Sequence, residues 1–239
     1  MKKTMIMALA AFAMCGSAQA QFVEADNGFS VMGLFGMTIS NLRMNDMPSE
    51  GMNPKAGLTV GARAEYLLPE CRGVFVNAGL EYTMKGGRER VSGDIDDMLG
   101  LDATGIARPM YLQLPIHVGY RYDVLEDLGV YADFGPYFAI GTNGKYRLKY
   151  DNFDEDYTES FFNSKGELNW KMRRWDCGIG FRVGAEYARH YNFILGCDWG
   201  LTDMLTQKQK NGLVTNPLLG IKNPSVRNFN AALTVAYRF

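Results

Sequence analysis

The sequence predicts an all-β protein, an eight-stranded antiparallel up-and-down transmembrane β-barrel, and three observations carry that prediction. Apolar and polar residues alternate over segments of about eleven residues, the connections between segments are alternately short and long, and the last segment runs to Phe239. Eleven residues tilted by about 45° cross about 25 Å, the height of the apolar band of an outer membrane. Strands of soluble sheets are usually about five or six residues long.

The first twenty residues are expected to be a signal peptide, which leaves 21–239 as a single barrel domain. Two lysines precede an apolar run from Thr4 to Cys15, and Ala18 to Ala20 provide a small-x-small cleavage site. The mature chain is then exported, and an exported barrel of this kind is expected in the outer membrane. The near balance of 25 basic and 26 acidic residues argues against a nucleic-acid partner.

Eight segments show the two-residue period. In the segment from Tyr191 to Thr202, for example, Leu195 and Trp199 fall on one face and Asp198 falls on the other. The first segment is the weakest, because Met32 and Leu34 interrupt its polar face. The predicted strands are 29–40, 58–68, 74–83, 110–122, 130–140, 174–187, 191–202 and 228–239.

The connections alternate in length without exception. The short ones are 69–72, 123–127 and 188–190, and the long ones are 41–54, 86–108, 142–169 and 203–227. A barrel with both termini in the periplasm has tight turns on that side and tolerates long loops outside. This pattern therefore favours a membrane barrel over a soluble sandwich.

The polar face is predicted to line the barrel interior. It is rich in glycine and carries both signs of charge, which suits a narrow eight-stranded lumen filled by side chains. A soluble carrier of lipocalin type is the alternative, and it would place the apolar face inside. The predicted lumenal charge network comprises Arg63, Glu65, Glu81, Arg121, Asp133, Asp176, Arg182, Glu186, Asp198 and Arg238.

Aromatic residues on the apolar face gather at the strand ends, as expected for rings with one polar edge at the headgroup level. The predicted interface aromatics are Tyr66, Tyr82, Tyr120, Tyr122, Tyr187, Tyr191, Trp175, Trp199, Tyr237 and Phe239. Tyr82, Trp175 and Trp199 are expected toward the outer side and the others toward the periplasm. Tyr237 and Phe239 also belong to the terminal stretch "ALTVAYRF", which resembles the signal read by the barrel-assembly machinery of bacterial outer membranes.

The mature chain as a whole resembles the PorT-like family of outer-membrane β-barrel proteins, architectural relatives of the small OmpA-type and OmpX-type barrels. The resemblance is carried by "AQAQ" at the cleavage site, "FSVMGLFGMTIS", "AGLTVGARAEYLL" and the Leu-Pro pair in "YLQLPIHVGYRY". Some members of that family are linked to protein secretion and gliding. The resemblance implies an outer-membrane location and a β-barrel fold, and it implies less about the biochemical function.

The sequence offers few candidates for chemistry, and no catalytic residue, cofactor or metal site is predicted. His117 falls on the interior face, where Glu81 of the neighbouring strand could approach it, but an interior hydrogen-bonded histidine is the preferred interpretation. His190 is expected in a solvated turn. Cys177 and Cys197 are predicted to lie out of register on adjacent strands, and Cys71 is the expected free thiol.

We therefore expect a non-enzymatic barrel with a structural, adhesive or secretion-associated role carried by its long loops. A lipid-modifying barrel enzyme and a small-solute channel are the alternatives. The expected partners are outer-membrane lipid and lipopolysaccharide, the assembly machinery, and a secretion-system or extracellular protein. The acidic and aromatic stretch from Lys149 to Phe162 is the expected place for a protein contact, with cation binding as a weaker alternative.

Overall fold

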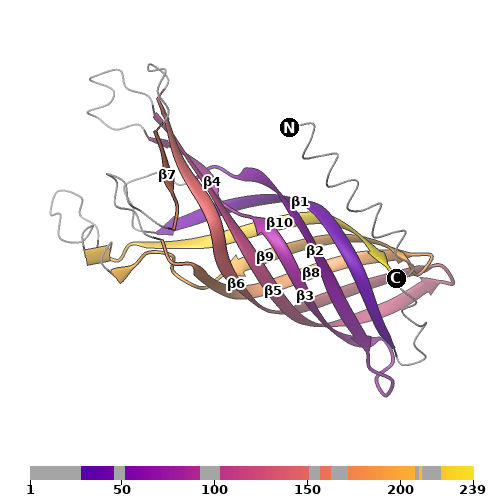
Figure 1. Ribbon diagram of the computed structural model, residues 1–239. Coiled ribbons are helices and arrows are strands. Elements are labelled where there is room, and N and C mark those ends of the chain that lie inside the picture. Colours follow the sequence, from indigo (N-terminus) through magenta and orange to yellow (C-terminus); the bar gives the residue numbers. More distant parts are fainter. Residues whose placement is uncertain are drawn as a thin grey trace.

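The computed structural model describes residues 28–45, 52–91, 103–150, 157–162, 172–207, 210–211 and 222–239. Antiparallel strands within these ranges form one sheet that closes on itself (Figure 1). No helix among the described residues is long and apolar enough to cross a membrane.

The strands follow the chain in an up-and-down order. Their bounds are β1 (Phe29–Asn45), β2 (Lys55–Leu67), β3 (Val74–Met84), β4 (Gly87–Val91), β5 (Ala103–Leu125), β6 (Leu128–Tyr150), β7 (Tyr157–Ser160), β8 (Trp175–Tyr187), β9 (Tyr191–Gly200) and β10 (Ser225–Arg238). The ring runs β1-β2-β3-β5-β6-β8-β9-β10 and returns to β1, with β4 beside the first part of β5 and β7 beside the last part of β6. The prediction of an eight-stranded antiparallel barrel is confirmed.

The last strand closes the ring against the first. The register of β1 and β10 runs from Met32 opposite Arg238 to Asn45 opposite Ser225. The amide of Phe239 donates a hydrogen bond to the carbonyl of Val31 at 2.9 Å, so pairing continues to the final residue. Closure removes the exposed edges that an open sheet would present.

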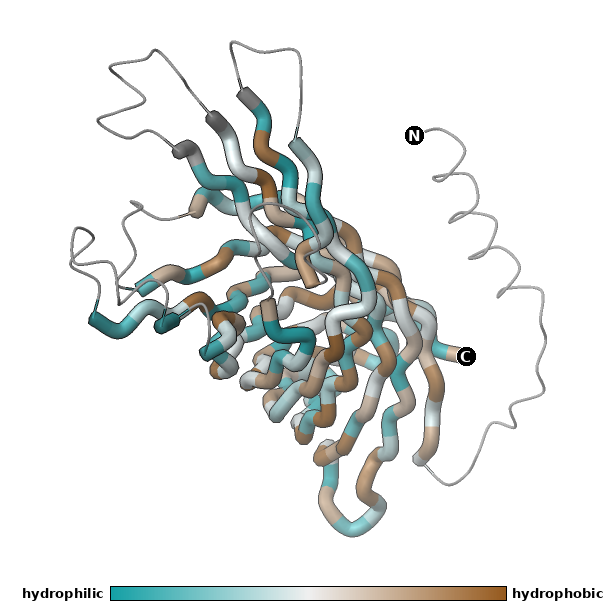
Figure 2. Tube along the Cα trace, turned by 60° about the vertical axis from the view of Figure 1, so that its left-hand side comes forward, coloured by the Kyte–Doolittle hydropathy of each residue, from teal (hydrophilic) through white to brown (hydrophobic). Residues whose placement is uncertain are grey.

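Side chains alternate in burial along most of each strand of the barrel ring, and the apolar side faces outward. In β8, Asp176 and Arg182 are buried in the lumen, whereas Trp175 and Phe181 are exposed on the outer wall. Figure 2 shows hydrophilic and hydrophobic residues alternating along the strands. The carrier alternative, with its apolar face inside, does not describe this barrel.

Two of the predicted long connections were wrong in extent, because strands occupy much of them. β5 and β6 are each 23 residues long, about twice the length that the apolar band needs. A register shift between Met110 and Tyr111 leaves Thr142 and Asn143 both exposed on β6. This bulge breaks the two-residue alternation, which is why the sequence pattern ended there.

The extensions of β5 and β6 form a second structural feature beyond the barrel wall. We call β4, residues 103–110 of β5, residues 143–150 of β6 and β7 the outer sheet. In Figure 1 this sheet rises at the upper left, away from the barrel, while the short turns lie at the lower right together with the C-terminus. We call the two ends of the molecule the loop end and the turn end.

Candidate functional site

The lumen is filled by three layers of paired charges, and the first lies near the turn end. Arg121 contacts Glu65 at 2.6 Å and Glu186 at 3.4 Å. Arg238 contacts the same two carboxylates at 3.0 and 2.7 Å and also donates to the Ser30 hydroxyl at 2.9 Å. Each arginine thus has two partners of opposite sign, which offsets the cost of removing these charges from water.

The middle layer is organised by Arg182. Its guanidinium lies 3.4 Å from Glu81, 3.9 Å from Asp133 and 4.0 Å from Asp198. Arg63 from β2 contacts Glu81 at 2.9 Å, so this carboxylate is shared by two arginines. The layer joins β2, β3, β6, β8 and β9 across the lumen and fixes their relative positions.

His117 belongs to this layer and is only 2 % exposed. Its Nδ1 lies 2.5 Å from Asp133 Oδ1. Arg182 Nη1 lies 2.7 Å from Nδ1 and 3.2 Å from Nε2 of the same ring. The predicted approach of Glu81 to His117 is indirect, since the two residues are joined through Arg182.

The third layer lies toward the loop end and contains a residue that the sequence analysis missed. Lys85 forms an ion pair with Asp176 at 3.0 Å, and Tyr137 and Asn228 donate to the same carboxylate at 3.3 and 2.8 Å. The Lys85 ammonium also lies 4.4 Å from the centre of the Tyr137 ring. Lys85 directly follows the last residue of β3 and continues the inward-facing parity of Glu81, and that parity was the available signal.

Above the third layer, apolar side chains cap the lumen at the loop end. The cluster comprises Leu42, Met52, Ala107, Tyr111, Tyr137, Ala139, Phe161, Phe162, Met172, Met204, Leu205 and Val226. Tyr111 and Phe161 both pack edge-to-face against the ring of Phe162. Near the middle layer a cavity of about 20 Å³ remains, which is room for roughly one water molecule. The described part of the lumen is therefore packed rather than open.

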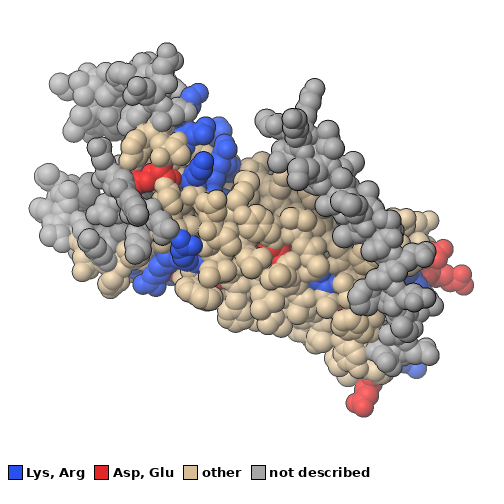
Figure 3. Space-filling model, viewed as in Figure 1, with Lys and Arg blue, Asp and Glu red and all other residues tan. Residues whose placement is uncertain are grey.

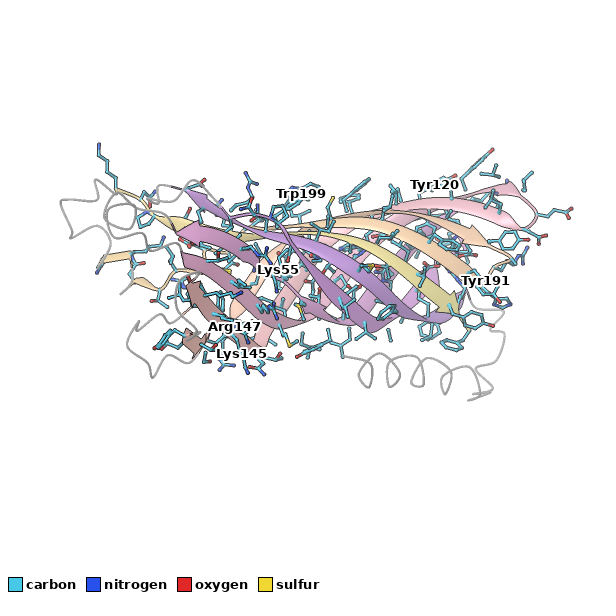
Figure 4. All side chains as sticks on the ribbon, turned by 90° about the horizontal axis from the view of Figure 1, so that it is seen from above. Lys55, Tyr120, Lys145, Arg147, Tyr191 and Trp199 are labelled. Carbon is cyan, nitrogen blue, oxygen red and sulfur yellow. The ribbon has the colours of Figure 1, made fainter. Side chains whose placement is uncertain are left out.

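The predicted aromatic residues lie on the outer wall near both ends of the barrel. Figure 4 shows Tyr120 and Tyr191 at the turn end and Trp199 toward the loop end. Tyr237 is half-buried and packs against Tyr191, Phe239 and His190, the last in a stacked arrangement at 5.6 Å. His190 itself is exposed in the turn between β8 and β9.

The three described cysteines are free thiols. Cys71 is exposed in the turn between β2 and β3. Cys197 is opposite Phe181, and the Cys177 carbonyl accepts a hydrogen bond from the Leu201 amide at 2.8 Å, so the two cysteines are out of register, as predicted. Residues 151–156 of the acidic stretch lie outside the described residues. Within the described part of the chain, no three His, Cys, Asp or Glu residues are grouped to hold a metal ion.

A closed ring of outward-facing apolar strands around a lumen of paired charges defines a transmembrane β-barrel. The chain belongs to the family described as outer membrane protein beta-barrel domain, which it matches over residues 18–206. It is a protein of the outer membrane. No curated protein matches the sequence.

Several solved structures are similar to this chain at low sequence identity. The outer membrane protein OprG from Pseudomonas aeruginosa is 15% identical with a TM-score of 0.48, and the match covers 89% of this chain and 96% of OprG. A major outer membrane protein from Thermus thermophilus is 14% identical, with a TM-score of 0.42 and coverages of 87% and 99%. The attachment invasion locus protein Ail of Yersinia pestis is 12% identical, with a TM-score of 0.38 and coverages of 89% and 99%.

Proposed function

We propose that this barrel is a non-enzymatic surface protein whose outer sheet and attached loops bind a protein partner, in adhesion or in a secretion assembly. The observation that carries the proposal is the length of the β5–β6 hairpin. Residues 103–110 of β5 extend roughly 25 Å along the strand beyond the apolar band. A membrane anchor alone does not need this extension, whereas a rigid platform for recognition does.

The outer sheet is held rigidly enough to serve as such a platform. Pairing of β5 with β6 continues to Ala103 opposite Tyr150, and β4 and β7 add a strand on each side. The cluster of Tyr111, Phe161 and Phe162 packs beneath it. The exposed side chains on its surface include Lys149 and Thr158, which are polar.

Two features support a binding role over an enzymatic one or a channel. His117, the only lumenal histidine among the described residues, is enclosed by Asp133 and Arg182 in the middle of the packed lumen, out of reach of membrane lipid. For conduction, the layers of paired charges and the apolar cap leave little open space along the axis. We expect His117→Ala to leave the lipid profile of the outer membrane unchanged and planar bilayers to record no conductance.

Within the family, we infer that the chain belongs with the PorT-like barrels, on the strength of "FSVMGLFGMTIS", "AGLTVGARAEYLL" and the Leu-Pro pair in "YLQLPIHVGYRY". The assembly machinery is then a partner during insertion, reading the strand that ends in Tyr237 and Phe239. Deleting Phe239 should lower the amount of folded barrel in the outer membrane without changing the export of the chain.

Site-specific photo-crosslinking in living cells tests the binding role. A photoreactive amino acid at Thr158 or Lys149 should give a discrete protein adduct, because both side chains are exposed on the outer sheet. The matched control is Glu126, which is exposed in the short turn between β5 and β6 at the opposite end. Adducts of equal yield from Glu126, or adducts with lipid alone at the two outer positions, would contradict the proposal.

A further inference from the structure

Among the residues that the structure describes, exposed charges differ between the two ends of the barrel. Every described Asp or Glu that is exposed lies at the turn end, and these residues are Glu70, Asp123, Glu126 and Asp127. The exposed cations of the described ranges lie mainly at the loop end: Arg43, Arg88, Arg108, Lys145, Arg147, Lys149, Arg173, Lys222 and Arg227. Figure 3 shows blue side chains over the upper left part of the molecule, with a smaller red group among them, and mainly red ones at the far right.

Four of these cations and the half-buried Lys55 form one group, which we call the basic patch: Lys55, Arg88, Arg108, Lys145 and Arg147. The strand register brings them together. Arg108 is directly opposite Lys145, Arg88 is opposite Ile106, and Arg147 lies on the other side of Ile106. Figure 4 shows Lys145 and Arg147 projecting outward from the loop-end half of the barrel.

Within the basic patch, like charges lie close to one another. Like charges directly opposite across a strand pair destabilise a sheet, and Arg108 with Lys145 is such a pair. Lys55, which lies above the apolar band, has its pKa lowered to about 8 by burial and by the positive charges of Arg108 and Arg88. A second pair of the same kind is Arg43 opposite Arg227 on β1 and β10. An anion at this level would relieve the repulsion.

The wall directly below the basic patch is apolar and exposed. On β5 the outward positions after Arg108 lead to Leu112, Leu114 and Ile116, and on β6 Phe138 and Ile140 are their neighbours. Arg108 and Leu112 are four positions apart, or about 13 Å along the strand. Going from the loop end toward the middle of the barrel, the surface is first cationic and then apolar. The charged headgroup and the acyl chains of a lipid follow one another in the same order.

We propose that the basic patch binds the phosphate groups of an anionic glycolipid of the outer leaflet, whose acyl chains lie on the exposed wall of β5 and β6. The continuity of the patch with the membrane-facing wall favours a lipid over a soluble polyanion. This inference needs only the barrel and its place in the membrane, so it stands apart from the protein-binding role proposed above.

The test uses the full chain folded in uncharged maltoside micelles, with bis-phosphorylated lipid A as the probe and native mass spectrometry as the readout. The patch variant is Arg108→Gln with Lys145→Gln, and the matched control is Arg72→Gln with Arg189→Gln at the turn end. All four side chains are exposed, and folding is checked by the heat-dependent electrophoretic shift. Each basic side chain near an anionic lipid surface contributes roughly fivefold, so the patch variant should bind about 25-fold more weakly.

The control variant should bind lipid A as the wild type does, and lipid A without its phosphates should bind much more weakly to the wild type. Equal binding of the phosphorylated and dephosphorylated lipids would overturn the proposal, as would an equal loss in both variants. Displacement of lipid A by millimolar inorganic phosphate would show a simple anion site and would also overturn it. A sulfated oligosaccharide that binds the patch as tightly as lipid A does would refute the lipid assignment.

Discussion

Lys85 and Asp176 form an ion pair at 3.0 Å across the lumen, and neither side chain is exposed to any extent. The two residues are 91 positions apart in the chain, and the pair joins β8 to the two-residue connection between β3 and β4. Tyr137 supplies a ring face to the ammonium and a hydroxyl to the carboxylate. The pair therefore fixes the barrel just below the apolar cap.

Removing one member of this pair should destabilise the barrel more than removing both. Lys85→Met leaves the Asp176 carboxylate buried with only two hydrogen-bond donors, and such a loss costs about 3–5 kcal/mol. The double variant Lys85→Met, Asp176→Leu leaves no unpaired charge at this position, so part of the lost free energy of unfolding should be recovered. Urea unfolding in lipid vesicles measures both free energies. A double variant that is less stable than Lys85→Met would show that the charge itself does not matter.

The depth of the apolar band predicts different costs for arginine at two positions on the outer wall. Leu195 is 58 % exposed in the middle of β9, where Leu195→Arg should cost about 2–4 kcal/mol if the side chain meets the bilayer midplane. Leu201 is equally exposed just beyond the end of β9, where the cost should fall to roughly 0–1 kcal/mol. The same unfolding measurement compares them. If Leu195→Arg and Leu201→Arg lost the same free energy of unfolding, the membrane would not cross the strands at the height proposed here.

The interior of the narrow barrel requires glycine at particular positions. A Cβ at Gly135 would lie 2.2 Å from the Ile116 carbonyl oxygen and 2.8 Å from the Cα of His117, and these backbone atoms cannot move aside. Gly135→Ala should therefore cost about 1–3 kcal/mol. At Gly33 the nearest atom is a ring carbon of Phe239 at 3.7 Å, so Gly33→Ala serves as the tolerated control. Similar stability of the two variants would contradict the packing described for the middle layer.

The barrel wall was predictable because side chains along each strand face lipid and lumen in turn, with a period of two residues. Trp199 faces lipid and its neighbour Asp198 faces the lumen. The polarity of each residue in the sequence therefore indicates which face of the wall its side chain occupies. The hairpin turns were predictable for the same reason, since alternation stops at Tyr187 and resumes at Tyr191.

The outer sheet and the apolar cap were not predictable in this way. Above the band, water replaces lipid outside, so the outward positions no longer need to be apolar, and the bulge opposite Met110 shifts the parity. Phe161 and Phe162 are adjacent residues and yet both are buried, because they enter the lumen from outside the strands. Which cation meets which anion also depended on the register of strands far apart in the chain, as with Lys85 and Asp176.

Lys55 should give a pH-dependent signal that reports the basic patch directly. Its pKa in the folded barrel is lowered from 10.5 to about 8, mainly by burial and further by the charges of Arg108 and Arg88. Between these two values the unfolded chain binds more protons than the folded one, so this residue makes the barrel more stable as the pH rises from 8 toward 10.5. The side chain is partly exposed and the change is correspondingly small.

Acetylation of Lys55 by a soluble reagent, followed by mass spectrometry across a pH series, measures the same titration without unfolding the protein. The rate should rise with a midpoint near 8 in the wild type. Arg108→Gln removes one repelling charge, so the midpoint should move upward while staying below 10.5, because burial is the larger cause. Arg72→Gln at the turn end should leave it unchanged. A wild-type midpoint near 10.5 would mean that Lys55 does not experience the two arginines.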